Sequence, residues 1–311
     1  MIKVDAISKN YAGKSVVDTI SFEAHNQEIL ILLGTSGCGK TTTLKMINRL
    51  IETDTGHILI DGQNIRDKKI EDLRMGIGFI MQNTGLFPHY TIQENIATVP
   101  KLLKWDKKHI QNRTNELMHK LHLSTDMLVR YPHELSGGQQ QRVGIIRALI
   151  ANTPVLLMDE PFGALDNITK SEIHTAFKSL DELKNKTTIL VTHDVQEAFE
   201  LGHRIALMDK GKILQIGTPK EMIYRPKNDF VSNFFASNRL LLEHKVTTLA
   251  DLEKMFHIQD IIQPTLSAQS SLSAQSTVWS ALQHLSTDKH DFDRYEKLSK
   301  AFAAYRKMQI T

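Results

Sequence analysis

The sequence predicts an α/β fold built on a mixed sheet with a parallel core. Between residues 1 and about 235, short apolar runs alternate with amphipathic stretches, which is typical of such folds. Near-continuous apolarity within a run indicates a strand that helices cover on both faces, as in a parallel sheet. Three runs have this character: Ile29–Leu33, Val155–Met158 and Thr188–Val191.

Two amphipathic segments are predicted to be helices. The first extends from Asp106 to about Leu121, with Ile110, Leu117, Met118 and Leu121 on one face. The second extends from Asp293 to Met308. Its inward residues are expected to be Leu298, Ala301, Phe302 and Tyr305, and its outward residues Lys297, Lys300, Arg306 and Lys307.

The pattern loosens after Pro226, and we place a domain boundary near residue 240. The expected domains are 1–238, which contains the motifs described below, and 239–311, a small regulatory or accessory region. Residues 263–277 are rich in Ser, Ala and Gln and contain a short near-repeat, which is typical of a linker.

The composition of the 311 residues restricts the function. Lys and Arg total 38 and Asp and Glu total 35, so the formal net charge is only +3, which argues against a broad nucleic-acid-binding surface. No apolar run approaches the roughly 18 residues that suggest a membrane span, and residues 1–5 do not resemble a signal peptide. The single cysteine, Cys38, excludes an intrachain disulfide. We therefore expect a soluble, cytoplasmic protein.

A glycine-rich loop follows the first apolar strand and precedes an apparent helix, Thr42–Leu50. It matches the phosphate-binding pattern G-x-x-x-x-G-K-[ST] at every fixed position. Backbone N–H groups and the helix N-terminus would surround phosphate oxygens, Lys40 would approach the β- and γ-phosphates, and the Thr41 hydroxyl could coordinate Mg²⁺. A thiol reagent on Cys38 would be expected to block nucleotide. The predicted nucleotide contacts are Gly34, Thr35, Ser36, Gly37, Cys38, Gly39, Lys40, Thr41 and Thr42.

A second nucleotide motif ends the strand Val155–Met158 with two carboxylates, Asp159 and Glu160. Ligands bind at the carboxyl ends of strands in open α/β sheets. Asp159 would hold Mg²⁺, and Glu160 would act as the general base toward the attacking water.

A phosphate loop alone also permits kinases, GTPases and helicases. The discriminating segment is Leu135-Ser136-Gly137-Gly138-Gln139-Gln140-Gln141-Arg142, which lies shortly before Asp159. With the two nucleotide motifs, this segment resembles the signature of the ATP-binding subunits of ABC transporters. The resemblance covers residues 1 to about 235 and implies an ABC-type ATPase with a helical signature subdomain, using ATP and Mg²⁺.

The resemblance assigns further roles. Tyr11 stands where the family stacks an aromatic ring on adenine, and Gln82 stands where a glutamine contacts Mg²⁺ or the attacking water. Asp166 belongs to the loop that contacts the opposite subunit, and His193 matches the histidine that contacts the γ-phosphate. The family acts as a head-to-tail homodimer, so Ser136, Gly137, Gly138 and Gln139 of one subunit would close on the nucleotide bound by the other.

A DNA-associated ATPase of this class is the less favoured alternative, because no coiled-coil run or cysteine pair interrupts the chain before the signature. A transport subunit without a membrane span implies two integral membrane permease subunits and an external substrate-binding protein. We therefore expect a peripheral location on the cytoplasmic face of the membrane. Leu86, Phe87 and Tyr90 are the expected apolar socket for the permease, and ordinary packing of the helical subdomain is the alternative interpretation.

Substrate identity rests on resemblance alone. The stretches 77–82, 85–89 and 94–105 resemble the importers of quaternary-amine osmoprotectants such as glycine betaine, carnitine and choline. An importer of an amino acid or a polyamine is the alternative. Residues 257–264 and 278–285 resemble the opening of a CBS module, and the basic face of the last helix suggests a sensor of ionic strength, although a plain solvated face is the simpler interpretation.

Overall fold

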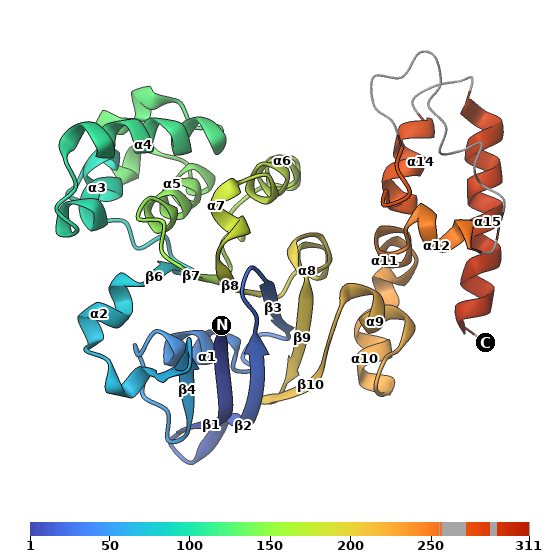
Figure 1. Ribbon diagram of the computed structural model, residues 1–311, viewed down its shortest axis with the longest axis horizontal. Coiled ribbons are helices and arrows are strands. Elements are labelled where there is room, and N and C mark those ends of the chain that lie inside the picture. Colours follow the sequence, from blue (N-terminus) through green and yellow to red (C-terminus); the bar gives the residue numbers. More distant parts are fainter. Residues whose placement is uncertain (255, 257–271, 287–290, 311) are drawn as a thin grey trace. The chain divides into compact units, whose positions relative to one another are not determined.

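The computed structural model describes residues 1–254, 256, 272–286 and 291–310. These residues belong to two compact units, Met1–Leu214 and Gln215–Thr311. The division between the units precedes the expected boundary after residue 238, so the functional division at that point stays a prediction. Figure 1 labels most of the helices and strands of both units.

The first unit contains an antiparallel sheet at the N-terminal end of the chain. Its central strand, β1, pairs Ile2 with Ala24 on one side and with Ile60 on the other. The strands in spatial order are β2 (Lys14–Ala24), β1 (Ile2–Tyr11), β4 (Thr55–Ile60) and β5 (Gln63–Asn64).

The second sheet has six strands, and five of them form a parallel run. This run includes the three strands expected from their apolarity. Every residue of β3, β7 and β8 is buried, which confirms strands covered on both faces. The spatial order is β10 (Lys212–Gly217), β9 (Arg204–Asp209), β3 (Ile29–Gly34), β8 (Thr187–Thr192), β7 (Val155–Asp159) and β6 (Ile77–Ile80). The run from β9 to β6 is parallel.

Helices accompany the parallel strands and form a helical subdomain between β6 and β7 (Figure 1). The subdomain helices pack on one another and are α3 (Ile92–Leu102), α4 (Lys107–Lys120) and α5 (Gly137–Leu149). The other helices of the unit are α1 (Lys40–Ile47), α2 (Ile70–Met75), α6 (Asn167–Lys178), α7 (Asp181–Lys184) and α8 (Val195–Leu201). The 3-10 turns are η1 (Ile65–Asp67), η2 (Thr125–Val129) and η3 (Pro132–Glu134).

Two expected helices of this unit are present, with one difference in bounds. The segment predicted over Asp106–Leu121 is α4, and the Asp106 side chain accepts a hydrogen bond from the His109 N–H at 2.9 Å, which caps its N-terminus. The helix after the phosphate loop begins at Lys40 and ends at Ile47, before the expected end at Leu50, because Arg49 adopts a left-handed backbone with φ of 47°.

The second unit is helical in its described part. Its helices are α9 (Pro219–Tyr224), α10 (Asp229–Phe234), α11 (Arg239–Val246), α12 (Leu249–Glu253), α14 (Val278–Ser286) and α15 (Phe292–Ile310), with the 3-10 turn η4 (Ala236–Asn238). The predicted inward face of α15 is confirmed, since Leu298, Ala301, Phe302 and Tyr305 are buried in one cluster with Leu249, Leu252, Val278, Ala281 and Leu285.

The predicted outward orientation is wrong for one residue of α15. Arg306 is half-buried, and its Nε forms an ion pair with Oε2 of Glu243, a fully buried residue of α11. The other carboxylate oxygen of Glu243 accepts a bond of 2.8 Å from Arg239 Nε. Most of the Ser/Ala/Gln-rich segment, and residues 257–264 of the CBS-like stretch, lie outside the described residues; residues 278–285 form most of α14.

Candidate active site

The phosphate loop follows β3 with a backbone that only glycine accommodates at two points. A Cβ on Gly34 would lie 2.2 Å from the Met208 carbonyl oxygen on the neighbouring strand. A Cβ on Gly39, whose φ is +103°, would lie 2.5 Å from the Val16 carbonyl oxygen. These close approaches explain the first and last glycines of the motif, because any side chain there would open the loop.

Lys40 lies in the curve of this loop, and its side chain is nearly buried. The Nζ atom donates to the Gly34 carbonyl at 2.9 Å and to the Thr35 carbonyl at 2.8 Å. The adjacent cavity has a volume of about 170 Å³, and it is lined by Val16, by the loop residues Ser36, Gly37 and Gly39–Thr42, and by Gln82 and Glu160. Residues from three predicted motifs therefore share one cavity.

Thr41 and Asp159 provide a hydroxyl and a carboxylate beside this cavity. The Thr41 hydroxyl donates to Asp159 Oδ1 at 2.9 Å, and Asp159 is 3% exposed. Burial raises the pKa of Asp159, the hydrogen bond from Thr41 opposes that shift, and neighbouring Glu160 adds to it. Oxygen ligands of this kind suit Mg²⁺, which usually takes one or two protein oxygens together with phosphates and waters. The described residues contain no group of three or more His, Cys, Asp or Glu side chains that could hold a metal ion.

Glu160 contacts two of the other three predicted catalytic side chains, His193 and Gln82, and the third is Lys40. Its Oε1 lies 2.9 Å from His193 Nδ1, and its Oε2 accepts a hydrogen bond of 3.3 Å from Gln82 Nε2. Glu160 has a left-handed backbone with φ of 48°, and its N–H donates to the Val191 carbonyl at 2.9 Å. Such a conformation costs about 1–3 kcal/mol and is typical of functional positions.

The parallel sheet brings these residues together. Strands β6, β7 and β8 are neighbours in that order, so their carboxyl ends meet at one edge. Asp159 pairs in register with Val191, and His193 follows β8 directly after Thr192. Gln82 comes two residues after the end of β6. Sheet order thus explains how residues far apart in sequence contact one carboxylate.

The signature begins α5 and has a structural role in its own chain. Ser136 Oγ accepts from the Gln139 N–H at 3.3 Å, and Gln139 Oε1 accepts from the Ser136 N–H at 2.9 Å, which forms a capping box. A Cβ on Gly138 would lie 2.8 Å from Leu165 Cδ2. No signature residue lines the cavity at the phosphate loop, so the structure does not bring the signature to its own nucleotide site.

The remaining predicted residues lie apart from this cavity. Asp166 Oδ1 accepts from the Thr169 N–H at 3.0 Å near the start of α6. Tyr11 ends β1, is 45% exposed and lies with its ring centroid 5.6 Å from Lys9 Nζ. Its role toward adenine stays a prediction.

Cys38 does not face the cavity. It is 3% exposed, and its Sγ lies 3.7 Å from Lys40 Nζ beneath the loop. Burial raises the pKa of the Cys38 thiol, and the positive charge of Lys40 opposes this shift. The expectation that a thiol reagent on Cys38 blocks nucleotide stays a prediction, and the burial of the thiol limits the access of such a reagent in this conformation.

Two residues that hold the loop after Gln82 were missed by sequence reasoning. Arg147 donates to the Gly85 carbonyl at 2.7 Å and to the Thr84 carbonyl at 2.8 Å. Asn95, fully buried on α3, accepts from the Phe87 N–H at 2.7 Å and donates back to the Phe87 carbonyl at 3.1 Å. A polar Asn among the apolar positions of a helix was the available signal for the second residue.

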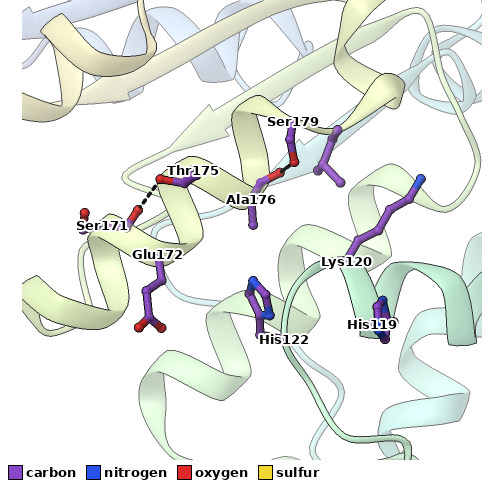
Figure 2. A pocket seen from close by; sticks show the side chains of 9 residues that line it. His119, Lys120, His122, Ser171, Glu172, Thr175, Ala176 and Ser179 are labelled. Atoms are coloured by element: carbon purple, nitrogen blue, oxygen red, sulfur yellow. Dashed lines mark hydrogen bonds between the residues drawn. The ribbon is translucent and has the colours of Figure 1, made fainter. Parts of the chain in front are cut away.

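The larger cavity in Figure 2 is a different feature of the same unit. It has a volume of about 770 Å³ and lies between the end of α4 and α6, where His122 and Glu172 are among its lining residues. None of the predicted site residues lines it. Nucleotide chemistry is therefore assigned to the smaller cavity, where Lys40, Thr41 and Glu160 converge.

Comparisons with known proteins also indicate an ATP-binding protein of a transporter. A family model described as "ABC transporter" matches residues 17–163. The glycine betaine/carnitine/choline transport ATP-binding protein OpuCA of Bacillus subtilis (strain 168) is 46% identical over 274 residues, which cover 88% of this chain and 71% of that protein. The glycine betaine uptake system ATP-binding protein YehX of Escherichia coli (strain K12) is 46% identical over 240 residues, which cover 77% of this chain and 78% of that protein.

A solved structure agrees at the level of fold. The dimeric ATP-binding cassette MJ0796, in a post-hydrolysis state bound to ADP and Pi, matches with a TM-score of 0.65 and 31% sequence identity over 70% of this chain and 98% of that chain. On the strength of these likenesses and of the phosphate loop, the paired carboxylates and the signature, the chain belongs to the ABC transporter family of ATP-binding proteins.

Proposed function

We propose that this chain is the ATP-hydrolysing subunit of an importer for quaternary-amine osmoprotectants. The observation that carries the enzymatic part is the position of Glu160, which lies at the cavity of the phosphate loop with His193 and Gln82 on its two carboxylate oxygens. A carboxylate held in this way is suited to accept a proton from an attacking water.

The residues in and beside the cavity have different roles in ATP hydrolysis. The loop amides and Lys40 bind the phosphates, while Thr41 and Asp159 would hold Mg²⁺, which neutralises phosphate charge when bound. Glu160 takes the proton of the water, and Gln82 and His193 orient that carboxylate. Phosphoryl transfer depends mainly on such positioning and charge stabilisation.

A head-to-tail homodimer would complete the site. The cavity at the phosphate loop is lined without the signature, while Ser136 and Gly137 are exposed at the start of α5. A second copy could therefore present its α5 N-terminus, with the N–H groups of Gly137 and Gly138, to the bound triphosphate. The dimeric state named for the related cassette supports this arrangement.

Two integral membrane permease subunits are the proposed partners. None of the described helices has the length and hydropathy needed to span a bilayer. Phe87 and Tyr90 are 47% and 46% exposed, with ring centroids 5.3 Å apart, while Leu86 is partly buried. This aromatic pair, on the loop fixed by Asn95 and Arg147, would receive a segment of a permease at the cytoplasmic face of the membrane.

Quaternary amines are the proposed cargo, together with an external substrate-binding protein that delivers them. Support comes from two relatives at 46% identity whose names give glycine betaine, carnitine or choline as transported solutes. An importer of an amino acid or a polyamine is the second candidate.

The test is uptake in a cell that lacks this chain. Radiolabelled glycine betaine, carnitine and choline would be offered at raised osmolarity to cells restored with the wild-type chain, with Glu160→Gln or with nothing. We expect uptake only with the wild-type chain. Uptake of labelled proline or spermidine alone would select the second candidate, and ATPase activity of the purified chain that responds to DNA would reject transport.

A further inference from the structure

The orientation of the His193 side chain depends mainly on the backbone that carries it. Its side chain is 62% exposed, so surrounding side chains constrain it little, although Nδ1 must lie within reach of Glu160 Oε1. The turn formed by Thr192, His193 and Asp194 therefore determines where the imidazole lies.

That turn is held by hydrogen bonds on both sides of His193. The Thr192 hydroxyl accepts from the Asp194 N–H at 3.0 Å and donates to Glu197 Oε2 at 2.9 Å. Asp194 Oδ1 accepts from the N–H groups of Gln196 at 2.8 Å and Glu197 at 3.2 Å, which caps α8. The two carboxylates thus fix the residues that flank the histidine.

Lys170 of α6 forms ion pairs with both carboxylates. Its Nζ lies 2.5 Å from Asp194 Oδ2 and 3.3 Å from Glu197 Oε2. Glu197 is 2% exposed, and its Oε1 has no hydrogen-bond partner among the residues that the structure describes. Burial raises the pKa of Glu197, and the charge of Lys170 opposes that rise. Without this ammonium group, a buried carboxylate beside Asp194 would lose its counter-charge, and the turn would lose its tie to α6.

Lys170 is also one helical turn from the loop expected to contact the opposite subunit. The Lys170 N–H donates to the Asp166 carbonyl at 2.8 Å, and the Ala164 N–H of the same loop donates to Gln141 Oε1 of the signature helix at 3.0 Å. A displacement of the loop Gly163–Asp166 would therefore move Lys170 and, through it, the turn that carries His193.

We propose that Lys170 is a positioning residue for His193: by pairing with Asp194 and Glu197, it holds the imidazole against Glu160 and couples it to the loop Gly163–Asp166. The inference rests on the proposed ATPase function. Lys170 touches no reacting atom and acts through the backbone of Thr192–Asp194.

The test uses the full chain with Lys170→Met, Lys170→Arg and the matched control Lys178→Met, an exposed lysine on the same helix. We expect Lys170→Met to lower kcat for ATP by between about 10-fold and 100-fold, the cost of a small misplacement of a catalytic group, with the Kd for ATP unchanged. Lys170→Arg should restore most of the activity, and Lys178→Met should behave as wild type.

The imidazole ¹⁵N resonances of His193, assigned by their loss in His193→Ala, provide a readout that a purely structural role would not move. They should shift in Lys170→Met and return toward wild type in Lys170→Arg. If Lys170→Met does not fold, Asp194→Ser replaces it, because serine keeps the helix cap and removes the ion pair. Wild-type kcat and an unmoved His193 resonance in a folded variant would overturn the positioning role. A wild-type chain without Mg-ATPase activity would instead reject the proposed function, and the resonance experiment would still be decisive for Lys170.

Discussion

Glu160 and His193 meet at the ends of two neighbouring parallel strands, with Glu160 Oε1 2.9 Å from His193 Nδ1. Gln82 contacts the other carboxylate oxygen from the end of a third strand, at 3.3 Å. The carboxylate is therefore oriented from two sides at a cavity lined by the phosphate loop. This arrangement is suited to orienting a single proton acceptor toward a bound triphosphate.

Replacing Glu160 with glutamine should separate ATP binding from hydrolysis. Glu160→Gln keeps the size of the side chain and loses the proton acceptor, so ATP hydrolysis should fall by at least about 10²-fold while ATP binding persists. Phosphate release and equilibrium binding of ATP measure the two effects, and size-exclusion chromatography with ATP should show an accumulated dimer. Glu172→Gln, an exposed glutamate on α6, is the matched control. Near-normal turnover in Glu160→Gln would remove this residue from the role of base.

Replacing Asp159 with asparagine should stabilise the ligand-free protein while weakening its function. Burial raises the pKa of Asp159 in the folded chain above the unfolded value of 3.8. Between the unfolded pKa of 3.8 and the higher folded pKa, the folded state binds more protons at this residue than the unfolded state does. The contribution of Asp159 to the free energy of unfolding therefore falls as the pH rises through this range. The buried carboxylate is therefore a net cost to folding at pH values above the unfolded pKa, and Asp159→Asn removes this cost.

Thermal unfolding without nucleotide checks this prediction. The Tm of Asp159→Asn should exceed that of wild type at neutral pH, and the gain should shrink as the pH falls toward 3.8. The stabilisation of the protein by Mg-ATP should be weaker in the variant, because a ligand for the ion is lost. A lower Tm for the ligand-free variant at neutral pH would contradict the assigned cost.

Much of this site could be predicted from local sequence, because the phosphate loop and the Asp159–Glu160 pair each follow a buried apolar strand. The contact of Gln82 with Glu160 could not, since it joins residues 78 positions apart and depends on the order β6–β7–β8. Local periodicity contains no information about which strands become neighbours. The same reason explains the missed Lys170, whose partner Asp194 lies 24 positions away on another helix cap.

The Cys38 thiol should react slowly with alkylating reagents. Its pKa is raised from the ordinary value of 9.0 by burial, and the thiolate is the reactive form. Because the chain has one cysteine, the mass increase after iodoacetamide treatment reports this site alone. The rate should be well below that of free N-acetylcysteine under the same conditions and lower still with Mg-ATP. An alkylation rate equal to that of the free thiol would show an open loop.

Removing the Asn95 amide should loosen the loop that carries Phe87 and Tyr90. Asn95→Leu leaves the Phe87 N–H and carbonyl without their buried partner, at a cost of about 1–3 kcal/mol in the free energy of unfolding. ATP binding by the purified chain should persist, while solute uptake in cells should fall because the aromatic pair is no longer held. Urea unfolding and uptake measure the two effects. Gln93→Leu, a half-buried neighbour on α3, is the control, and equal uptake by the two variants would contradict the role of Asn95.

Arg306 should stabilise the second unit, in contrast to the exposed Lys300 on the same helix. Its guanidinium pairs with the fully buried Glu243, which among the described residues keeps its ion pair with Arg239 if Arg306 is removed. Loss of a charged hydrogen bond of this kind costs about 1.5–3 kcal/mol, so Arg306→Met should lower the free energy of unfolding of this unit. Lys300 pairs with Glu296 at the surface, and Lys300→Met should change little.

The fluorescence of Trp279, measured with Trp105 replaced by phenylalanine, follows the unfolding of the second unit separately. If Arg306→Met left that transition unchanged but altered the salt dependence of transport, the residue would belong to an ionic-strength sensor and not to the core of the unit.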